Sequence, residues 1–401
     1  MQEPSTSPSA ILQFRQDIEA QFRRHIREAL EVSLAEELTA ALVSDRHERR
    51  PDRRGYRHGT TERTVTTPAG TRALTVPRGR VIGEDGTTTE FQSRLLPRYA
   101  RRTRAVDEAI LGCYLGGINS RRIRTALKPL LGVAHLSKSA VSRIVGRLKA
   151  LFATWQRRDL SAERYAIVFL DGFHLKVRLA RRVVSVPVLA ALGVTETGQK
   201  CLLSLRLAAS EAEATWGAVV ADLQQRGLVA PLLLVADGHG GLKKALERWE
   251  GVRVQRCTTH KLENLKAHCP RHARPEMKRD YDRIIYASDA LAARAAYDAF
   301  LRKWSTLCPA VAKSLEEAGL ELLTFYDFPK MTWKAIRTTN TLENLNREFR
   351  RRTKTQASFG TEDAALTVLY GLVAFGQIEL RRIDGCKHLP SFLEKMWQKV
   401  A

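Results

Sequence analysis

The chain has 401 residues, too many for one ordinary hydrophobic core, so two or three domains are expected. Hydrophobic residues make up 44% of the sequence, which excludes an intrinsically disordered chain. The 66 Lys and Arg residues outnumber the 43 Asp and Glu residues, and the net charge of +23 favours a polyanionic partner over a merely solvated basic surface.

The positive charge is unevenly distributed along the chain. Residues 51–160 contain 22 Lys and Arg but only 8 Asp and Glu, which is typical of a DNA-binding region. No run of 18 apolar residues is present, and the first ten residues lack the basic and apolar regions of a secretory signal. Neither a membrane span nor secretion is therefore expected, and the six scattered cysteines are predicted to be reduced in the cytoplasm.

Two kinds of element are predicted in the first hundred residues. Residues 11–45 carry apolar side chains at helical spacing, including Ile18 and Phe22, which predicts an amphipathic helix. Self-association and packing within the same chain are both open for this helix. Residues 46–104 mix Arg with Thr, Gly and Pro, and the segments ERTVTT and TRALTVPR around PAG predict a short β-hairpin.

Residues 105–155 return to a helical pattern. Segments 118–132 and 136–155 predict two helices, with Ser137 as the N-cap of the second. In a helix-turn-helix the start of the second helix faces the bases, and the residues there are Lys138, Ser142 and Arg143. The connection is longer than the usual tight turn, so a plain helical pair is an equal alternative.

From residue 164 the pattern becomes α/β. Apolar strands are predicted at 164–178, 182–194, 199–209, 231–238 and 252–260, with helices at 211–227 and 240–249 between the later strands. The resulting order β-β-β-α-β-α-β predicts a ribonuclease-H-like core. Residues 264–335 have a helical pattern without strand alternation, which predicts an all-helical insertion into that core.

The organisation predicted from these patterns has five regions. A helical N-terminal region with a possible role in oligomerisation is followed by the basic DNA-binding region, the first part of the core, the helical insertion and the completion of the core. Their predicted bounds are 1–50, 51–160, 161–263, 264–335 and 336–401.

Three acidic residues stand where chemistry is expected. Asp171 lies inside the apolar run AIVFLDGFHLKV, where a carboxylate is costly unless it is paired or binds metal, although a turn with Gly172 is an alternative. Asp237 ends the buried strand PLLLVADG, where ligands gather in open sheets and where Asp-Gly turns are also common. Glu343 follows Asn340 at the spacing of a capping box, which is compatible with a metal-binding role.

The three acids together predict more than any one of them alone. Phosphoryl transfer by two metal ions needs carboxylates that hold both ions about 3.5–4 Å apart. Mg²⁺ prefers carboxylate oxygen and water as ligands. An Asp in the first strand, an Asp after the fourth and an acid on a later helix would converge at one edge of a ribonuclease-H-like sheet.

Basic residues surround Glu343 in the sequence. Arg347, Arg350, Arg351 and Lys354 share a helical face with it, which suits phosphate binding, although a solvated basic helix remains the alternative. The predicted DNA-binding residues in this part of the chain are therefore Arg337, Asn340, Arg347, Arg350, Arg351, Arg352 and Lys354.

Three other side chains are weaker candidates. Cys257 and His260, with His268, Cys269 and His272 nearby, admit a zinc site, but the C-x-x-C pairs of a firm zinc motif are missing. A buried thiol and a hydrogen-bonded histidine are favoured instead. Trp333 is a candidate for stacking on an unpaired base, and a core position is favoured for it.

The chain resembles the bacterial transposases of the Mutator type, which insertion sequences encode. The resemblance covers residues 50–385, and it is strongest in four motifs. These are FLDGFHLKVR (169–178), LVADGHGGLKKAL (234–246), QRCTTHKLENL (255–265) and IRTTNTLENLNREFRRRTKTQ (336–356).

The resemblance implies that Asp171, Asp237 and Glu343 are the catalytic and metal-binding acids, and that Cys257 and His260 have a structural or DNA-positioning role. Glu263 departs from the family, where many relatives have a basic residue. The implied enzyme binds the terminal inverted repeats of its element in double-stranded DNA and catalyses strand cleavage and transfer with two Mg²⁺ ions, which Mn²⁺ can replace.

The implied assembly is a homodimer or larger, in the cytoplasm at the nucleoid. Two other functions are open at this point: a DNA-binding regulator without catalysis, and a ribonuclease-H-like nuclease that lacks selectivity for inverted repeats.

Overall fold

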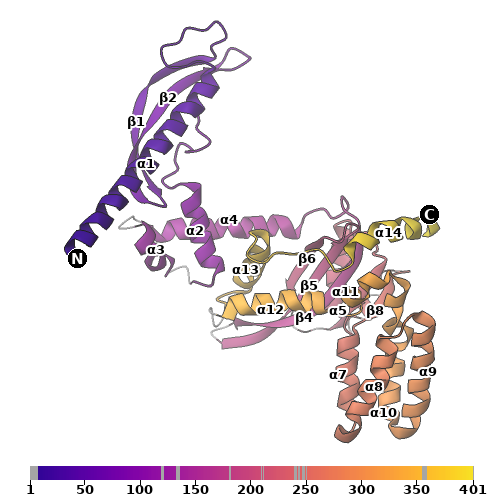
Figure 1. Ribbon diagram of the computed structural model, residues 1–401. Helices are drawn as coiled ribbons and strands as arrows, with labels where there is room; N and C mark the ends of the chain where they lie inside the picture. Colours follow the sequence, from indigo (N-terminus) through magenta and orange to yellow (C-terminus); the bar gives the residue numbers. More distant parts are fainter. Residues whose placement is uncertain are drawn as a thin grey trace, which may run out of the picture. The chain divides into compact units, whose positions relative to one another are not determined.

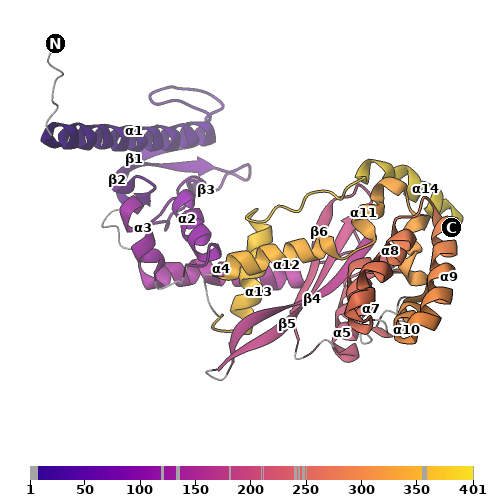
Figure 2. The ribbon, with the colours of Figure 1, turned by 60° about the horizontal axis from the view of Figure 1, so that its bottom comes forward.

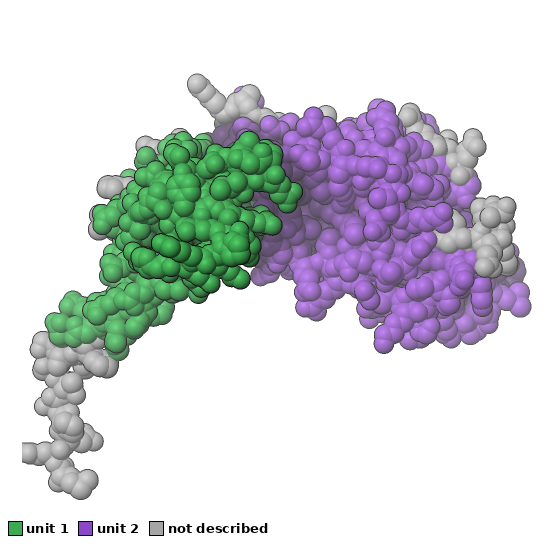
Figure 3. Space-filling view, turned by 90° about the horizontal axis from the view of Figure 1, so that it is seen from above, with its two compact units in different colours: residues 1–146 green, residues 147–401 purple. Residues whose placement is uncertain are grey.

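The computed structural model describes residues 8–400 apart from short gaps at 119–121, 132–135, 180–181, 209, 211, 239–241, 243, 246–248, 250 and 355–358. The chain divides into two compact units, Met1–Gly146 and Arg147–Ala401, which Figure 3 colours separately. The finer division into five regions stays a prediction.

The first unit begins with a helix that packs on a three-stranded antiparallel sheet (Figure 1). Leu34 of the helix lies in one apolar cluster with Val65 and Leu74 of the hairpin, so packing within the chain is confirmed. Ile18 and Phe22, nearer the helix start, are exposed, and self-association through them stays a prediction. The elements are α1 (Pro8–Leu42), β1 (Gly55–Thr67), β2 (Gly70–Ile82) and β3 (Thr88–Glu90), and the predicted hairpin is therefore confirmed.

Three helices follow in the same part of the chain. They are α2 (Arg104–Leu115), α3 (Ile123–Leu131) and α4 (Lys138–Gln156). Ile110, Leu127 and Ile144, one from each helix, share an apolar cluster that holds the helices together. The hydroxyl of Ser137 accepts a hydrogen bond from the backbone N–H of Ala140 at 3.1 Å, which confirms the predicted N-cap.

The second unit is built on a mixed five-stranded sheet in the order β6-β5-β4-β7-β8. Among the first three strands along the chain, β5 is antiparallel to its two neighbours β4 and β6, and β7 and β8 run parallel to β4. Figure 2 shows β4 and β5 as a long two-stranded ribbon. The strands are β4 (Tyr165–Leu179), β5 (Arg182–Thr195), β6 (Lys200–Leu207), β7 (Leu233–Ala236) and β8 (Arg253–Arg256).

Helices cover both faces of this sheet. On one face Trp216 and Val220 of α5 (Glu213–Gln225) pack in one cluster with Leu170 of β4. On the other face Phe349 of α12 (Asn340–Thr353) stacks on Phe173 of β4, with ring centroids 5.8 Å apart. Because side chains alternate along a strand, Asp171 lies on the face that α12 covers.

The strand β8 ends earlier than the sequence predicted. A strand through His260 is wrong, because Cys257 is the N-cap residue of α7 and the helical insertion begins at Thr258. The insertion itself is confirmed as mostly helical. Its elements are α7 (Thr258–His268), η1 (Arg271–Ala273), α8 (Arg274–Ile285), α9 (Ala290–Leu307), α10 (Pro309–Ala318), η2 (Gly319–Leu322), η3 (Thr324–Asp327), η4 (Lys330–Thr332) and α11 (Trp333–Ile336).

The chain returns from the insertion to the sheet through α12 and then adds three shorter elements. These are α13 (Glu362–Ala374), η6 (Cys386–His388) and α14 (Leu389–Val400). All six cysteines are free thiols, as predicted. Among the residues described, no helix is long and apolar enough to cross a membrane.

Candidate active site

Asp171 lies inside β4, where it pairs with Ala190 of β5. The alternative of a strand-end turn at Gly172 is wrong, because β4 continues to Leu179. The side chain is only 8% exposed, and its Oδ2 accepts a hydrogen bond from Nδ2 of Asn346 at 3.0 Å. Burial raises the pKa of Asp171 to about 7. A carboxylate that is this costly to ionise favours a bound cation.

Asp237 follows directly after β7, the parallel neighbour of β4. Leu170 of β4 pairs with Ala236 of β7. The residues that follow them, Asp171 and Asp237, therefore lie at the same level of the sheet. The backbone N–H of Gly238 donates to Oδ1 of Asp237 at 2.6 Å, which orients this carboxylate. The two aspartates thus converge, whereas the alternative of an Asp-Gly turn depends on residues 239–241, which lie outside the described part of the chain.

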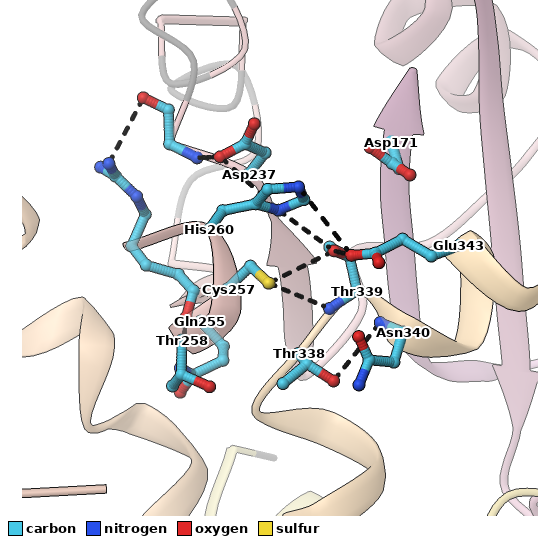
Figure 4. A network of polar contacts seen from close by, with 12 residues as sticks. Asp171, Asp237, Gln255, Cys257, Thr258, His260, Thr338, Thr339, Asn340 and Glu343 are labelled. Atoms are coloured by element: carbon cyan, nitrogen blue, oxygen red, sulfur yellow. Dashed lines mark hydrogen bonds and ion pairs between the residues drawn. The ribbon is translucent and has the colours of Figure 1, made fainter. Parts of the chain in front are cut away.

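Glu343 lies in the first turn of α12, but the predicted capping box is wrong. The helix begins at Asn340, and Thr339 rather than Asn340 is the N-cap residue. Thr339 makes no capping bond with its side chain; its hydroxyl donates to Oε1 of Glu343 at 2.7 Å. The bond ties the carboxylate to the start of the helix, where Figure 4 shows it close to His260.

His260 lies between two of the acids. Its Nδ1 is 3.9 Å from Oδ1 of Asp237, and its Nε2 is 3.9 Å from Oε1 of Glu343. A hydrogen bond with Cys257 raises the pKa of His260 to about 9, and the charges of both carboxylates act in the same direction. The charge of His260 in turn lowers the pKa of Asp171 against the effect of burial. Figure 4 shows Asp171, Asp237 and Glu343 around this imidazole.

Cys257 is buried behind the acids and is joined to α12. The backbone N–H of Thr339 donates to its Sγ at 3.4 Å. Burial raises the pKa of the Cys257 thiol, but hydrogen bonds with His260 and Thr339 outweigh it, so the pKa is lowered overall. Sγ of Cys257, a ring nitrogen of His260 and a carboxylate oxygen of Glu343 all lie within 4.8 Å of one another. His268, Cys269 and His272 do not belong to this set.

Asn346 and Thr339 are site residues that the sequence analysis did not single out. Asn346 is buried, and its Oδ1 has no hydrogen-bond partner among the described residues. The spacing N-x-x-E-x-x-N offered a signal, because Asn346 follows Glu343 by three residues and so shares its helical face. Thr339 gave no comparable signal, since two of its three side-chain partners, Cys257 and His260, lie 82 and 79 residues away in the chain.

A buried charge network behind Asp237 was also missed. Arg256, 4% exposed, donates to Glu317 of α10 at 3.1 Å, and the equally buried ammonium group of Lys261 donates to the same carboxylate at 2.8 Å. Nη2 of Arg256 also donates to the carbonyl oxygen of Gly238 at 3.3 Å. A Cβ atom at residue 238 would lie 1.6 Å from that nitrogen, so any other residue there would displace the Arg256 guanidinium group. The network ties the insertion to the backbone that follows Asp237.

Glu317→Ala is expected to destabilise the second unit by about 2 kcal/mol, because it removes the half-exposed carboxylate that two buried cations share and leaves Arg256 with Glu321, at 3.8 Å, as its remaining acid partner. All six Trp residues lie in that unit, so urea unfolding followed by Trp fluorescence measures its stability. Glu316→Ala, at an exposed neighbour on the same helix, is the matched control and should change stability little. Equal effects of the two substitutions would show that the network does not contribute.

The residues predicted to bind DNA beside Glu343 are mostly on the surface of α12. Arg347, Arg350 and Lys354 are exposed, and Arg350 lies over the ring of Phe173. Two other residues are paired with an acid, since Arg351 lies 2.7 Å and Arg352 3.6 Å from Glu348.

The remaining predicted residues are scattered. The guanidinium group of Arg337 lies 4.5 Å over the ring of Tyr286, and Asn340 is exposed at the first residue of α12. On α4, Ser142 and Arg143 are exposed, while the side chain of Lys138 lies outside the described part.

Trp333 occupies a packed position. Its ring meets those of Phe325 and Tyr326 edge-on at 5.7 and 4.6 Å, and its indole N–H donates to the carbonyl oxygen of Phe328. These contacts favour the core interpretation over base stacking. His239, two residues after Asp237, lies outside the described residues.

Comparisons with known proteins agree on one family. Residues 4–379 match the family described as "Transposase, Mutator family". The chain is 35% identical over 361 residues to the transposase for insertion sequence element IS1081 of Mycobacterium tuberculosis, covering 88% of this chain and 84% of that protein. It is 32% identical over 357 residues to the transposase for insertion sequence element IS905 of Lactococcus lactis, covering 87% of each.

A solved structure gives a much weaker likeness. The Drosophila P element transposase strand transfer complex is similar over 73% of this chain and 85% of that chain, at 12% identity and a TM-score of 0.30, which carries no argument about chemistry. The match along residues 4–379 and the identity to insertion-sequence transposases show that the chain belongs to the Mutator family of transposases.

Proposed function

We propose that this transposase cuts double-stranded DNA at the terminal inverted repeats of its insertion sequence and joins the cut ends to new DNA. In this proposal Asp171, Asp237 and Glu343 hold two divalent metal ions. The observation that carries it is the convergence of three acids from β4, β7 and α12 around His260, with Asp171 buried inside the sheet. Known relatives are named as transposases for insertion sequence elements, which supports the choice of substrate.

The sheet supports a ribonuclease-H-like core. Three antiparallel strands come first in the chain, and two further strands run parallel to the first of them, in the order β6-β5-β4-β7-β8. The first acid lies on the first strand, and the second acid follows the fourth. Strand ends in open sheets are where ligands gather, so this topology accounts for the convergence of Asp171 and Asp237.

The donor set fits Mg²⁺ or Mn²⁺. Carboxylate oxygens are the ligands that these hard cations prefer. The carboxylates of Asp171, Asp237 and Glu343 need not lie as close to one another as the side chains of Cys257, His260 and Glu343 do. Two ions about 3.5–4 Å apart spread their ligands over a wider site than one ion does. When bound, the ions supply Lewis acidity at the phosphate and lower the pKa of a water nucleophile.

The residues of the chain have separate tasks in this mechanism. Asn346 and the N–H of Gly238 hold the two aspartates through one hydrogen bond each. His260 offsets part of the negative charge that the carboxylates bring together. Arg347 and Arg350 lie beyond Glu343 on α12, and neither forms an ion pair with an acid in the described part of the chain, so both guanidinium groups are available for phosphates.

The double substitution Arg347→Ala and Arg350→Ala is expected to weaken DNA binding and to reduce the slope of log K against log[salt] by about 2, one unit for each lost phosphate contact. Binding of end-containing duplex at several salt concentrations measures this slope. Arg351→Ala is the control and should change the slope less, because Glu348 already neutralises Arg351. An unchanged slope in the double variant would show that these two arginines of α12 do not contact DNA phosphates.

The experiment that tests the function is cleavage of DNA that carries the element ends. We expect nicks at the ends with Mg²⁺ or Mn²⁺ and none with EDTA. A DNA-binding regulator would bind the ends without nicking in any metal. A general nuclease would cut unrelated duplex equally well in competition, which separates both alternatives from a transposase.

A further inference from the structure

Thr339 has an unusual set of neighbours. Its side chain is 0% exposed, and its hydroxyl oxygen lies 2.7 Å from Oε1 of Glu343, 3.3 Å from Sγ of Cys257 and 3.4 Å from Nδ1 of His260. A threonine hydroxyl has one proton to donate. The short distance to a carboxylate oxygen assigns that proton to Glu343, since charge-assisted hydrogen bonds are the shorter and stronger ones.

The backbone around Thr339 is fastened to the start of α7. The N–H of Thr339 donates to Sγ of Cys257 at 3.4 Å, and the N–H of Thr258 donates to the carbonyl oxygen of Arg337 at 3.0 Å. Cys257 is the N-cap residue of α7 and His260 lies in its first turn, so the C-x-x-H spacing places both beside Thr339. The first turns of α7 and α12 are thereby held together.

Each of the three acids then has its own hydrogen-bond donor. Asp171 accepts from Asn346, Asp237 from the N–H of Gly238, and Glu343 from Thr339. Glu343 loses the most conformational freedom when it is ordered, because a glutamate side chain has more rotatable bonds than an aspartate side chain. A donor that orders the carboxylate beforehand removes that cost from metal binding.

We infer that Cys257, His260 and Thr339 are positioning residues for Glu343: Cys257 and His260 hold Thr339, and the Thr339 hydroxyl fixes the carboxylate in its metal-binding orientation. The inference rests on the proposed role of Glu343. It gives the C-x-x-H motif a task in place of a zinc site: the motif orients an acid, Glu343, that lies far from it in the chain.

The test compares Thr339→Val with Thr339→Ser in the full chain. Valine keeps the shape of threonine without its hydroxyl, whereas serine keeps the hydroxyl. We expect Thr339→Val to weaken Mn²⁺ binding to the DNA-free protein about tenfold, as loss of hydrogen bonds behind metal ligands does, and Thr339→Ser to restore it. Binding is measured from the electron paramagnetic resonance signal of free Mn²⁺, and end cleavage is measured against Mn²⁺ concentration in parallel.

Thr338→Val is the matched control. Thr338 is buried one residue earlier and accepts a hydrogen bond from the N–H of Asn340, but it does not contact Glu343. Loss of the Thr338 hydroxyl should leave the Mn²⁺ affinity unchanged. If Thr339→Val does not fold, Cys257→Ala tests the same link from the other side. We expect it to weaken Mn²⁺ binding by less than the roughly tenfold loss expected of Thr339→Val, because it removes a support of Thr339 and not the hydroxyl that contacts Glu343.

Three outcomes would overturn the inference. Wild-type Mn²⁺ affinity in folded Thr339→Val is one, and an equal loss in Thr338→Val is another. The third is stoichiometric Zn²⁺ in the purified chain that Cys257→Ala removes, since Cys257 would then be a metal ligand. Glu343→Gln distinguishes these outcomes from a failure of the proposed function. If this variant keeps both Mn²⁺ binding and cleavage, the proposed role of Glu343 is wrong, whatever the Thr339 variants show.

Discussion

Asp171→Asn, Asp237→Asn and Glu343→Gln are each expected to reduce strand cleavage of element-end DNA by about 10³-fold or more, because catalytic groups that act as a unit fail together. Each change removes a charge and preserves shape. Binding of the same DNA should stay within a fewfold of the parent, since the acids do not contribute attractive charge to DNA. Nicking in Mg²⁺ and a binding assay in EDTA measure the two effects.

Asp280→Asn is the matched control for these variants. Asp280 is as buried as Asp171, at 8% exposure, but it lies in α8 of the insertion, where it accepts hydrogen bonds from Lys303 and Trp304. This variant is expected to lose stability and to keep its cleavage rate at low temperature. Substantial cleavage by any of the three site variants, or an equal loss in Asp280→Asn, would reject the assignment of the acids.

Asp171→Asn is also expected to stabilise the metal-free protein, and by more as the pH rises. The pKa of Asp171 is about 7 in the folded chain, against an ordinary value of 3.8, so the folded state binds the extra proton between these pH values. The contribution of Asp171 to folding stability therefore falls as pH rises through that window and is constant above it. The full difference corresponds to about 4 kcal/mol, at 1.36 kcal/mol per pKa unit.

Urea unfolding in EDTA measures this effect through the Trp residues of the second unit. The advantage of Asp171→Asn over the parent should grow by roughly 2–3 kcal/mol between pH 5 and pH 8. Asparagine keeps the oxygen that accepts from Asn346, so the hydrogen bond should survive. A pH-independent difference between the two proteins would mean that Asp171 ionises normally in the folded chain.

The face of the sheet that holds the proposed catalytic acids could be predicted from the sequence, because it depends on local patterns. The apolar run around Asp171 and the buried strand before Asp237 both predicted strands, and the structure has β4 and β7 there. Two strands that are adjacent and parallel bring the residues after Leu170 and Ala236 to one level. That placement needs only strand order, which the alternation of strands and helices supplied.

The hydrogen bonds within the site could not be predicted from local sequence patterns. Whether Asn340 or Thr339 caps α12 depends on where the chain leaves the insertion, and the packing of Cys257 against Thr339 decides it. Cys257 in turn was expected in a strand, because VRVQRC continues an apolar alternation that stops when α7 begins. A contact between residues 82 positions apart cannot be predicted from the local periodicity of the sequence.

The buried network of Arg256, Lys261 and Glu317 was missed for a related reason. Charged residues in a sequence are expected on the surface, and nothing local distinguishes Arg256 from the exposed arginines of the chain. Only the packing of α10 against α7 supplies the shared carboxylate that makes burial of two cations tolerable.

The most direct test of the three-acid site is to locate Mn²⁺ by anomalous diffraction in crystals of the full chain bound to precleaved end DNA. The account predicts two Mn²⁺ ions whose protein ligands are carboxylate oxygens of Asp171, Asp237 and Glu343. Ions that leave any one of these acids without a metal contact, or that bind only at Cys257 and His260, would contradict it.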